Sequence, residues 1–211
     1  MHPTGTPTSI TSTVLDFCRH VNPAGLPLYV TITPAKGCRA NDCFGCVKEK
    51  LERDGGRIQF GWAIWELPGV YIEAEHHAVY DSQTGLPLLD ITPSQLSQVR
   101  RRLFLPDDNA FYDFENEGVR RDNIRSALTD DVLIQQFFAA ASEKSRVWNT
   151  VPGVGVVSLD RETCERLERL ERDLGRVFYD LAIKYTPRGA LCFCDSGKKF
   201  KRCHGQSRIS K

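Results

Sequence analysis

Four side chains of the kinds that bind metal ions lie close together near the end of the chain. They form two pairs, Cys192 with Cys194 and Cys203 with His204, and eight residues separate the pairs. Structural zinc sites use four thiolate and imidazole ligands at the corners of a tetrahedron. Gly197 favours a turn that brings the two pairs together. Because the loop has few apolar side chains, we expect one structural zinc ion per chain to stabilise its fold.

A second candidate site centres on Cys43. Asn41 or Asp42 can cap the first turn of a helix, and apolar residues follow at helical spacing, so a helix is predicted to start at Cys43. That apolar stripe consists of Phe44, Val47 and Leu51. A thiol in the first turn faces unpaired backbone N–H groups and the positive end of the helix dipole, and both favour the thiolate form. Cys43 is therefore a candidate nucleophile.

A nucleophilic cysteine needs a base, and the base needs a group that orients it. Residues 57–67 and 70–80 alternate apolar and polar side chains and are joined by a Pro-Gly turn, which predicts two antiparallel strands. Residues 86–91 form a third strand of this meander. His77 lies on the second strand and Asp90 on the third, and they are the candidate base and orienting group.

The register of the second hairpin decides whether these two side chains meet. If a four-residue turn pairs Asp81 with Leu86, His77 lies directly across from Asp90, at about 5 Å between Cβ atoms. A slip of one residue would place His76 there instead.

Two other interpretations of the same residues remain open. Cys38, Cys43 and Cys46 could bind a second metal ion together with His76 or His77, because Cys-x-x-Cys is also a metal and redox spacing. Cys43 could also simply pack in the core, since cysteine is among the most commonly buried residues.

Further elements complete an α+β protein. Strands are expected at 26–33 and 101–105, and helices at 14–21, 130–144 and 160–185. The alternating charges of the last helix are typical of a solvated face with ion pairs.

The organisation follows from composition. We expect a flexible lead-in at 1–13, a core at 14–185 and a small metal-binding module at 186–211. The 211 residues carry a net charge of +1, no apolar run approaches the roughly 20 residues that span a bilayer, and the N-terminus lacks a signal-peptide pattern. Of the eight cysteines, three belong to the metal pattern, which favours metal and nucleophile chemistry over disulfides. We therefore expect a cytoplasmic protein.

The C-terminal pattern resembles the SEC-C zinc motif, found at the end of the translocation motor SecA and on many bacterial proteins. The motif has Cys-x-Cys, eight residues, and then Cys followed by Cys or His, and Cys192, Cys194, Cys203 and His204 match it. Residues 61–66, 73–79 and 90–93 also resemble a family of bacterial SEC-C-tailed proteins. In that family a Phe usually stands at the position of His76, which favours His77 as the functional histidine.

The order of Cys43, His77 and Asp90 resembles a minimal papain-like core, as in NlpC-type peptidases, transglutaminase-like proteins and arylamine acetyltransferases. The resemblance implies a thiol hydrolase or acyltransferase, with Cys43 as nucleophile, His77 as base and Asp90 holding His77. Amide, thioester and isopeptide substrates all fit.

The alternative is a non-catalytic adaptor that docks through its zinc module. SEC-C modules in SecA contact the chaperone SecB and the ribosome, so the resemblance implies an acidic protein or ribosomal RNA as partner. A basic surface on the module would suit either, although the same charges also suit a solvated tail. The basic residues after Cys194 are Lys198, Lys199, Lys201, Arg202, Arg208 and Lys211.

Overall fold

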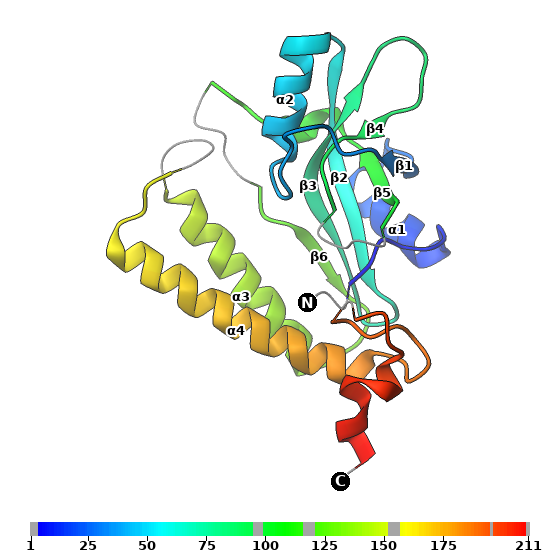
Figure 1. Ribbon diagram of the computed structural model, residues 1–211, viewed down its shortest axis with the longest axis vertical. Helices are drawn as coiled ribbons and strands as arrows, with labels where there is room; N and C mark the ends of the chain where they lie inside the picture. Colours follow the sequence, from blue (N-terminus) through cyan, green and yellow to red (C-terminus); the bar gives the residue numbers. More distant parts are fainter. Residues whose placement is uncertain (1–3, 95–98, 116–120, 152–156, 195, 210–211) are drawn as a thin grey trace.

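The computed structural model describes residues 4–94, 99–115, 121–151, 157–194 and 196–209. It is an α+β structure, as the sequence predicts (Figure 1). The helices are α1 (Ser12–Val21), α2 (Cys43–Asp54), α3 (Val132–Asn149) and α4 (Arg161–Tyr185). The strands are β1 (Leu28–Ile32), β2 (Arg57–Leu67), β3 (Tyr71–Asp81), β4 (Leu89–Asp90), β5 (Arg101–Pro106) and β6 (Ile124–Ala127). No described helix combines the length and apolar character that crossing a bilayer requires.

Five of the strands close into a barrel. They follow the order β2-β5-β1-β4-β3, and the long β2–β3 hairpin completes the circle. The predicted meander is present, since β2 pairs with β3 and β3 with β4. The sequence gives no sign of the closure, because β1 and β5 insert between the first and third strands of the meander. The short strand β6, which lies in a segment that the sequence pattern leaves unassigned, pairs with the start of β3.

Helices α1 and α2 cover the outer face of the barrel. Phe17 of α1 belongs to a core cluster with Trp62 and Ile64 of β2, and Val47 of α2 packs with Ala78 of β3. The inner face holds a second kind of core, in which Val30, Val79 and Phe104 meet. Helix α2 starts where the sequence predicts, and the residue after it, Gly55, has a φ of 71°.

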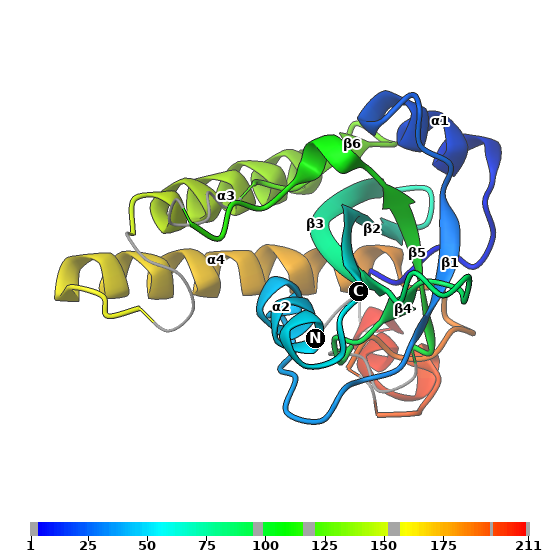
Figure 2. The same cartoon turned by 90° about the horizontal axis from the view of Figure 1, so that it is seen from above.

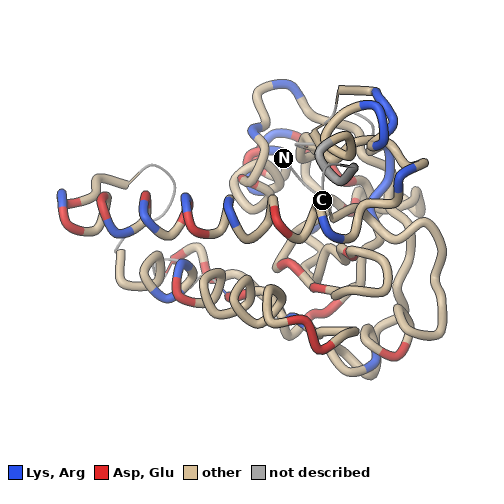
Figure 3. Tube along the Cα trace, turned by 90° about the horizontal axis from the view of Figure 1, so that it is seen from below, with Lys and Arg blue, Asp and Glu red and all other residues tan. Residues whose placement is uncertain are grey.

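Helices α3 and α4 form an arm that projects from the barrel (Figures 1 and 2). The arm is attached where Phe137 of α3 and Leu181 of α4 pack against Tyr71 of β3. Farther out, acidic and basic residues alternate along α4 (Figure 3). Pairs such as Arg161 with Glu165, four residues apart, agree with the solvated face expected from the sequence.

The register of the β3–β4 hairpin differs from the expectation. The structure pairs Tyr80 with Leu89, which places Asp90 opposite Val79 and two residues away from the predicted position across from His77. The slip has a physical cause: β4 is only two residues long and is also held by β1, whose Ile32 pairs with Asp90. A slip of two preserves the face of each side chain, so Asp90 and His77 still point to the same side.

Residues 4–8 contact the barrel, in contrast to the flexible segment expected from composition. Gly5 exchanges backbone hydrogen bonds with Glu66, at 3.0 and 2.8 Å. The Thr6 hydroxyl accepts a hydrogen bond from the Leu103 amide at 2.8 Å. These contacts hold the lead-in beside β2 and β5.

The crowding inside the barrel gives a testable prediction. A Cβ atom on Gly61, which pairs with His77, would lie 2.2 Å from the Leu105 carbonyl oxygen and 2.7 Å from the Phe104 ring. We expect Gly61→Ala to lower the free energy of unfolding by about 2–3 kcal/mol. Gly175→Ala in α4, where a Cβ meets nothing within 4 Å, should raise it by about 0.5–1 kcal/mol. Urea denaturation measures both, and a neutral Gly61→Ala would contradict the packing described.

Candidate functional site

Cys43 is the first residue of α2, and 7% of it is exposed. The preceding cap, Asp42, makes no side-chain hydrogen bond to the helix. The first-turn N–H groups therefore receive no acceptor from the cap side chain, which keeps the positive end of the helix dipole available beside the thiol. Cys43 lines a cavity of about 1020 Å³ that His76, His77 and Arg102 also line.

The cavity lies at an open edge of β3. Along this edge β4 pairs at Tyr80 and β6 pairs from Tyr71 to Ala74. Between these two pairings, residues 75–79 pair only with β2 on the opposite edge, and no described strand pairs with them on this edge. The lining side chains come from both faces of β3, so the cavity reaches the inside of the barrel through this gap.

Inside the barrel, His77, Asp90 and Arg102 form a polar cluster. Only 4%, 0% and 5% of these residues are exposed, which makes their pairing obligatory. The His77 Nε2 atom lies 3.1 Å from Asp90 Oδ2. Arg102 Nη1 donates a hydrogen bond to the same Asp90 oxygen and lies 2.7 Å from His77 Nε2. The Thr92 amide donates to the other Asp90 oxygen at 3.0 Å.

The protonation state of His77 decides whether its Nε2 atom hydrogen-bonds to Arg102 or to Asp90. A guanidinium can only donate, so Nε2 accepts from Arg102 when it is unprotonated and donates to Asp90 when it is protonated. Burial opposes the imidazolium, but electrostatic interactions with Cys43 and Asp90 outweigh it and raise the pKa of His77 from 6.5 to about 10. Burial opposes ionisation of Asp90 as well, yet His77 and Arg102 hold the pKa of Asp90 below its usual value. The favoured state is therefore the imidazolium form of His77 beside the ionised Asp90 carboxylate.

Sequence reasoning missed Arg102 as a member of this site. Residues 101–105 alternate as a strand, and Arg102 shares a face with Phe104, whose apolar ring points inward. A charged residue on the inward face of a strand is a signal of a buried ion pair. The partner could not be named, because β5 enters the barrel next to β1 and β2 and not next to β4.

The structure places the other candidate residues apart. In the described residues no hydrogen bond joins the Cys43 thiol to His77, although the two line one cavity. His76 lies on the outer face, where its Nε2 atom is 2.6 Å from the Ala110 carbonyl oxygen and its ring is 4.7 Å from that of Phe44. Burial lowers the pKa of His76.

The second-metal alternative finds no support in this geometry. Among the described residues, the only group of three or more Cys, His, Asp or Glu side chains close enough to hold one ion is the C-terminal set. Cys46 instead lies in the core with Val47 and Ala78, with Cys38 packed beside it. All eight cysteines are free thiols.

The C-terminal set converges on one point. Its four ligand atoms lie within 4.8 Å of one another. The Nδ1 atom of His204 is 3.3 Å from Cys192 Sγ and 3.4 Å from Cys203 Sγ. The sulfur atoms of Cys194 and Cys203 are 3.7 Å apart.

A short ribbon positions these ligands. Leu191 and Lys199 form a β-bridge, and Gly197, with a φ of 70°, turns the chain between them. Phe200 is fully buried in a small cluster with Phe193 and with Ala182 of α4. The module is therefore packed on the C-terminal end of α4 (Figure 1).

The geometry defines a small Cys₃His metal-binding module at the end of a long helix. More particularly, comparison with protein families matches residues 190–206 to the SEC-C motif, so the chain carries the SEC-C motif that its sequence resembles. Neither the curated proteins nor the solved structures compared with the chain contain a match.

The polar cluster inside the barrel gives a prediction about pH. Because the folded-state pKa of His77 is raised, its protonation stabilises the fold fully below pH 6.5, and this contribution is lost as the pH rises through about 10. Asp90→Asn removes one of the charges that raise it. We expect this variant to lower the pKa of His77 by at least about 1 and to flatten the loss of stability between pH 7 and 10.

NMR titration of the imidazole C–H signals measures the first effect, and urea denaturation across the pH range measures the second. The signal of His20, an exposed residue of α1, is the internal control in the same spectra. An unchanged His77 pKa in the Asp90→Asn protein would contradict the pairing described.

Proposed function

We propose that the chain is a zinc-carrying SEC-C protein whose barrel is a papain-like core that performs acyl transfer or hydrolysis at Cys43. In this proposal Cys43 is the nucleophile, His77 the general base and acid, and Asp90 the group that holds His77. The substrate is a carbonyl compound with a displaceable group, such as an amide, thioester or isopeptide.

One observation carries the catalytic proposal. Cys43 and His77 line the same cavity, and Asp90 engages the Nε2 atom of His77. The Nδ1 atom is therefore the ring nitrogen left to exchange a proton with a thiol or a leaving group. The electrostatic interaction with Cys43 also contributes to the raised pKa of His77, which is the direction that a thiolate–imidazolium pair requires.

The steps follow from these roles. In the starting state His77 already holds the proton taken from Cys43, and the Cys43 thiolate attacks the substrate carbonyl carbon, forming an S–C bond. The first-turn N–H groups of α2 stabilise the oxyanion. The bond to the leaving group then breaks, and His77 donates its proton to that group. Water or an acceptor, deprotonated by His77, attacks the thioester and releases the acyl group. Expulsion of the Cys43 thiolate beside the protonated His77 restores the starting pair.

The order of the elements also supports a papain-like core. A cysteine at a helix start is followed by the antiparallel strands β2, β3 and β4, of which β3 carries the histidine and β4 the carboxylate. This site differs from a simple set of cysteine, histidine and aspartate by the presence of Arg102, which contacts both His77 and Asp90. We propose that Arg102 keeps Asp90 ionised, so that the carboxylate orients the imidazolium without taking its proton.

The C-terminal ligands fit zinc. Zn–S bonds of about 2.3 Å at tetrahedral angles place two sulfur ligands about 3.8 Å apart, and a nitrogen ligand about 3.5 Å from each sulfur. The corresponding distances here are 3.7 Å between Cys194 and Cys203 and 3.3–3.4 Å from His204 Nδ1 to its two sulfur neighbours. When bound, zinc would cross-link the two ends of the ribbon, while Phe200 and Ala182 anchor it to α4.

Metal analysis tests the zinc site. We expect about one zinc ion per chain after purification without chelator, and Cys203→Ser should lose most of it because one of four ligands is gone. Cys164→Ser, which changes a cysteine of α4 outside the set, is the matched control and should keep the metal. Zinc clearly below one ion per wild-type chain would contradict the proposal, and two ions would revive the second site near Cys43.

Alkylation of individual cysteines tests the nucleophile. We expect iodoacetamide at pH 6.5 to modify Cys43 at least about tenfold faster than the more exposed Cys164, because the pair with His77 supplies thiolate. Burial raises the pKa of Cys18 to about 12. Burial, and to a smaller extent a hydrogen bond with Cys38, raise the pKa of Cys46 to about 12 as well. These two cysteines should stay unmodified and show that the fold is intact.

Mass spectrometry of the digested protein reads each site separately. His77→Gln should remove the advantage of Cys43 at pH 6.5, whereas Asp180→Asn on the exposed face of α4 should not. A Cys43 that reacts only above about pH 8 in the folded wild type would overturn the catalytic proposal and leave the zinc module untouched.

A further inference from the structure

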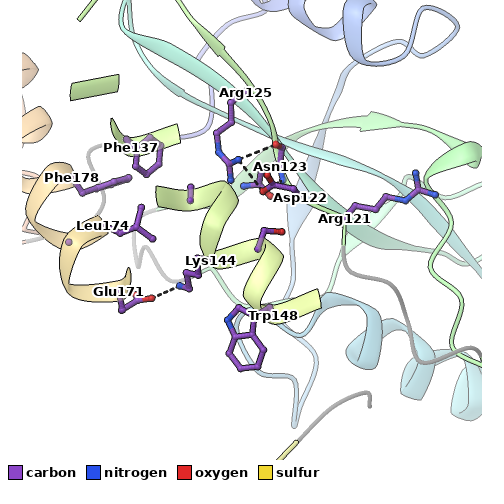
Figure 4. A pocket seen from close by; sticks show the side chains of 13 residues that line it. Arg121, Asp122, Asn123, Arg125, Phe137, Lys144, Trp148, Glu171, Leu174 and Phe178 are labelled. Atoms are coloured by element: carbon purple, nitrogen blue, oxygen red, sulfur yellow. Dashed lines mark hydrogen bonds and ion pairs between the residues drawn. The ribbon is translucent and has the colours of Figure 1, made fainter. Parts of the chain in front are cut away.

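A second hollow, of about 360 Å³, lies beside the cavity of Cys43, between α3 and α4 (Figure 4). One side is formed by residues 121–125, which lead into β6. The other side is apolar and comes from both helices of the arm. Its apolar residues are Phe137, Ala141, Trp148, Leu174 and Phe178.

The charged groups around this hollow already have partners. Arg125 donates a hydrogen bond to Asp122 at 3.0 Å and lies 3.3 Å from Glu73. Lys144 pairs with Glu171 across the two helices, as Figure 4 shows. Arg121 donates to the Asn109 carbonyl oxygen at 2.9 Å. Carboxylates neutralise Arg125 and Lys144, and Arg121 is held by a backbone carbonyl, so the wall that α3 and α4 offer to a ligand is mainly aromatic and aliphatic.

The hollow adjoins the cavity that contains Cys43. Six residues line both, so the two meet along a shared boundary. These shared residues are Arg121, Asn123, Arg125, Phe137, Lys144 and Phe178. The hollow is therefore the neighbouring space for a molecule that reaches Cys43.

Gly175 keeps the α4 wall of the hollow open. A glycine inside a helix costs about 0.5–1 kcal/mol relative to alanine. A Cβ atom here would meet nothing within 4 Å, so no contact within the described chain requires the glycine. A larger side chain at this position would project into space that the hollow provides.

We infer that the hollow is an apolar subsite of the Cys43 cavity and holds the aliphatic or aromatic tail of the acyl group. This inference rests on the proposed function. The acyl group must stay in place through both steps while the leaving group and the acceptor exchange with solvent. A fixed apolar wall that adjoins the cavity suits that part of the substrate.

Binding tests the subsite without chemistry. In the Cys43→Ala protein, calorimetry should detect binding of octanamide and not of acetamide, and octanamide should shift the indole N–H signal of Trp148. Adding Gly175→Phe should weaken octanamide binding at least about tenfold, because the ring fills the hollow. Adding Arg169→Phe, the same side chain on α4 outside both cavities, should leave binding unchanged. Equal affinity in the two double variants, or a Trp148 signal that does not move, would overturn the inference.

Acylation tests its role in the reaction. With Cys43 intact, release of p-nitrophenolate should be faster from the octanoate ester than from the acetate ester, and Gly175→Phe should lower this ratio about tenfold. The p-nitrophenyl ester of N-acetylphenylalanine distinguishes a peptide-like tail from an alkyl tail. If Gly175→Phe abolishes octanamide binding but Cys43 reacts with neither ester, the proposed function is contradicted and the subsite is supported. If the long and short esters react at equal rates and octanamide does not bind, the subsite is contradicted and the proposed function is supported.

Discussion

The burial of three polar side chains inside a small barrel is the constraint on which the rest of the structure depends. An uncompensated charge at such depth costs several kcal/mol, so Asp90, His77 and Arg102 must stay in contact. These residues come from β4, β3 and β5, and their contacts fix the three strands relative to one another. The same contacts set the protonation of His77, so the group that would perform the chemistry is also one that holds the barrel together.

The sequence predicted the elements whose causes are local. The start of α2 follows from the residues around Asp42 and the apolar stripe after Cys43, and the structure begins the helix at that cysteine. The β2–β3 hairpin follows from strict alternation around a Pro-Gly turn. The C-terminal ligand set was predicted in full, because four residues within a short loop leave the chain few ways to arrange them.

What could not be predicted depends on contacts between distant segments. The alternation of a strand tells which side chains share a face but not which strand becomes its neighbour. The insertion of β1 and β5 brought Arg102 to Asp90, and the parallel pairing of β1 with β4 moved the hairpin register by two residues. The pairing of His77 with Asp90 survived because it depended on the face and not on direct opposition. The hollow beside Trp148 depends on how α3 and α4 pack against the barrel. The periodicity of a sequence does not predict that packing.

Between residues 75 and 79 one edge of β3 pairs with no strand of the described chain, and this edge affects how such a barrel can change. A strand edge exposes backbone groups that attract other strands, and most barrels remove this hazard by closing completely. Here Cys43 at the start of α2 lines the cavity beside this strand edge, and His77 on the inner face lines the same cavity. The least protected edge of the barrel is therefore also the entrance to its interior. Lengthening β4 to seal this edge would make a sturdier and less aggregation-prone barrel. It would also wall off His77 from Cys43. The fold therefore retains a vulnerable edge at the position where access is needed.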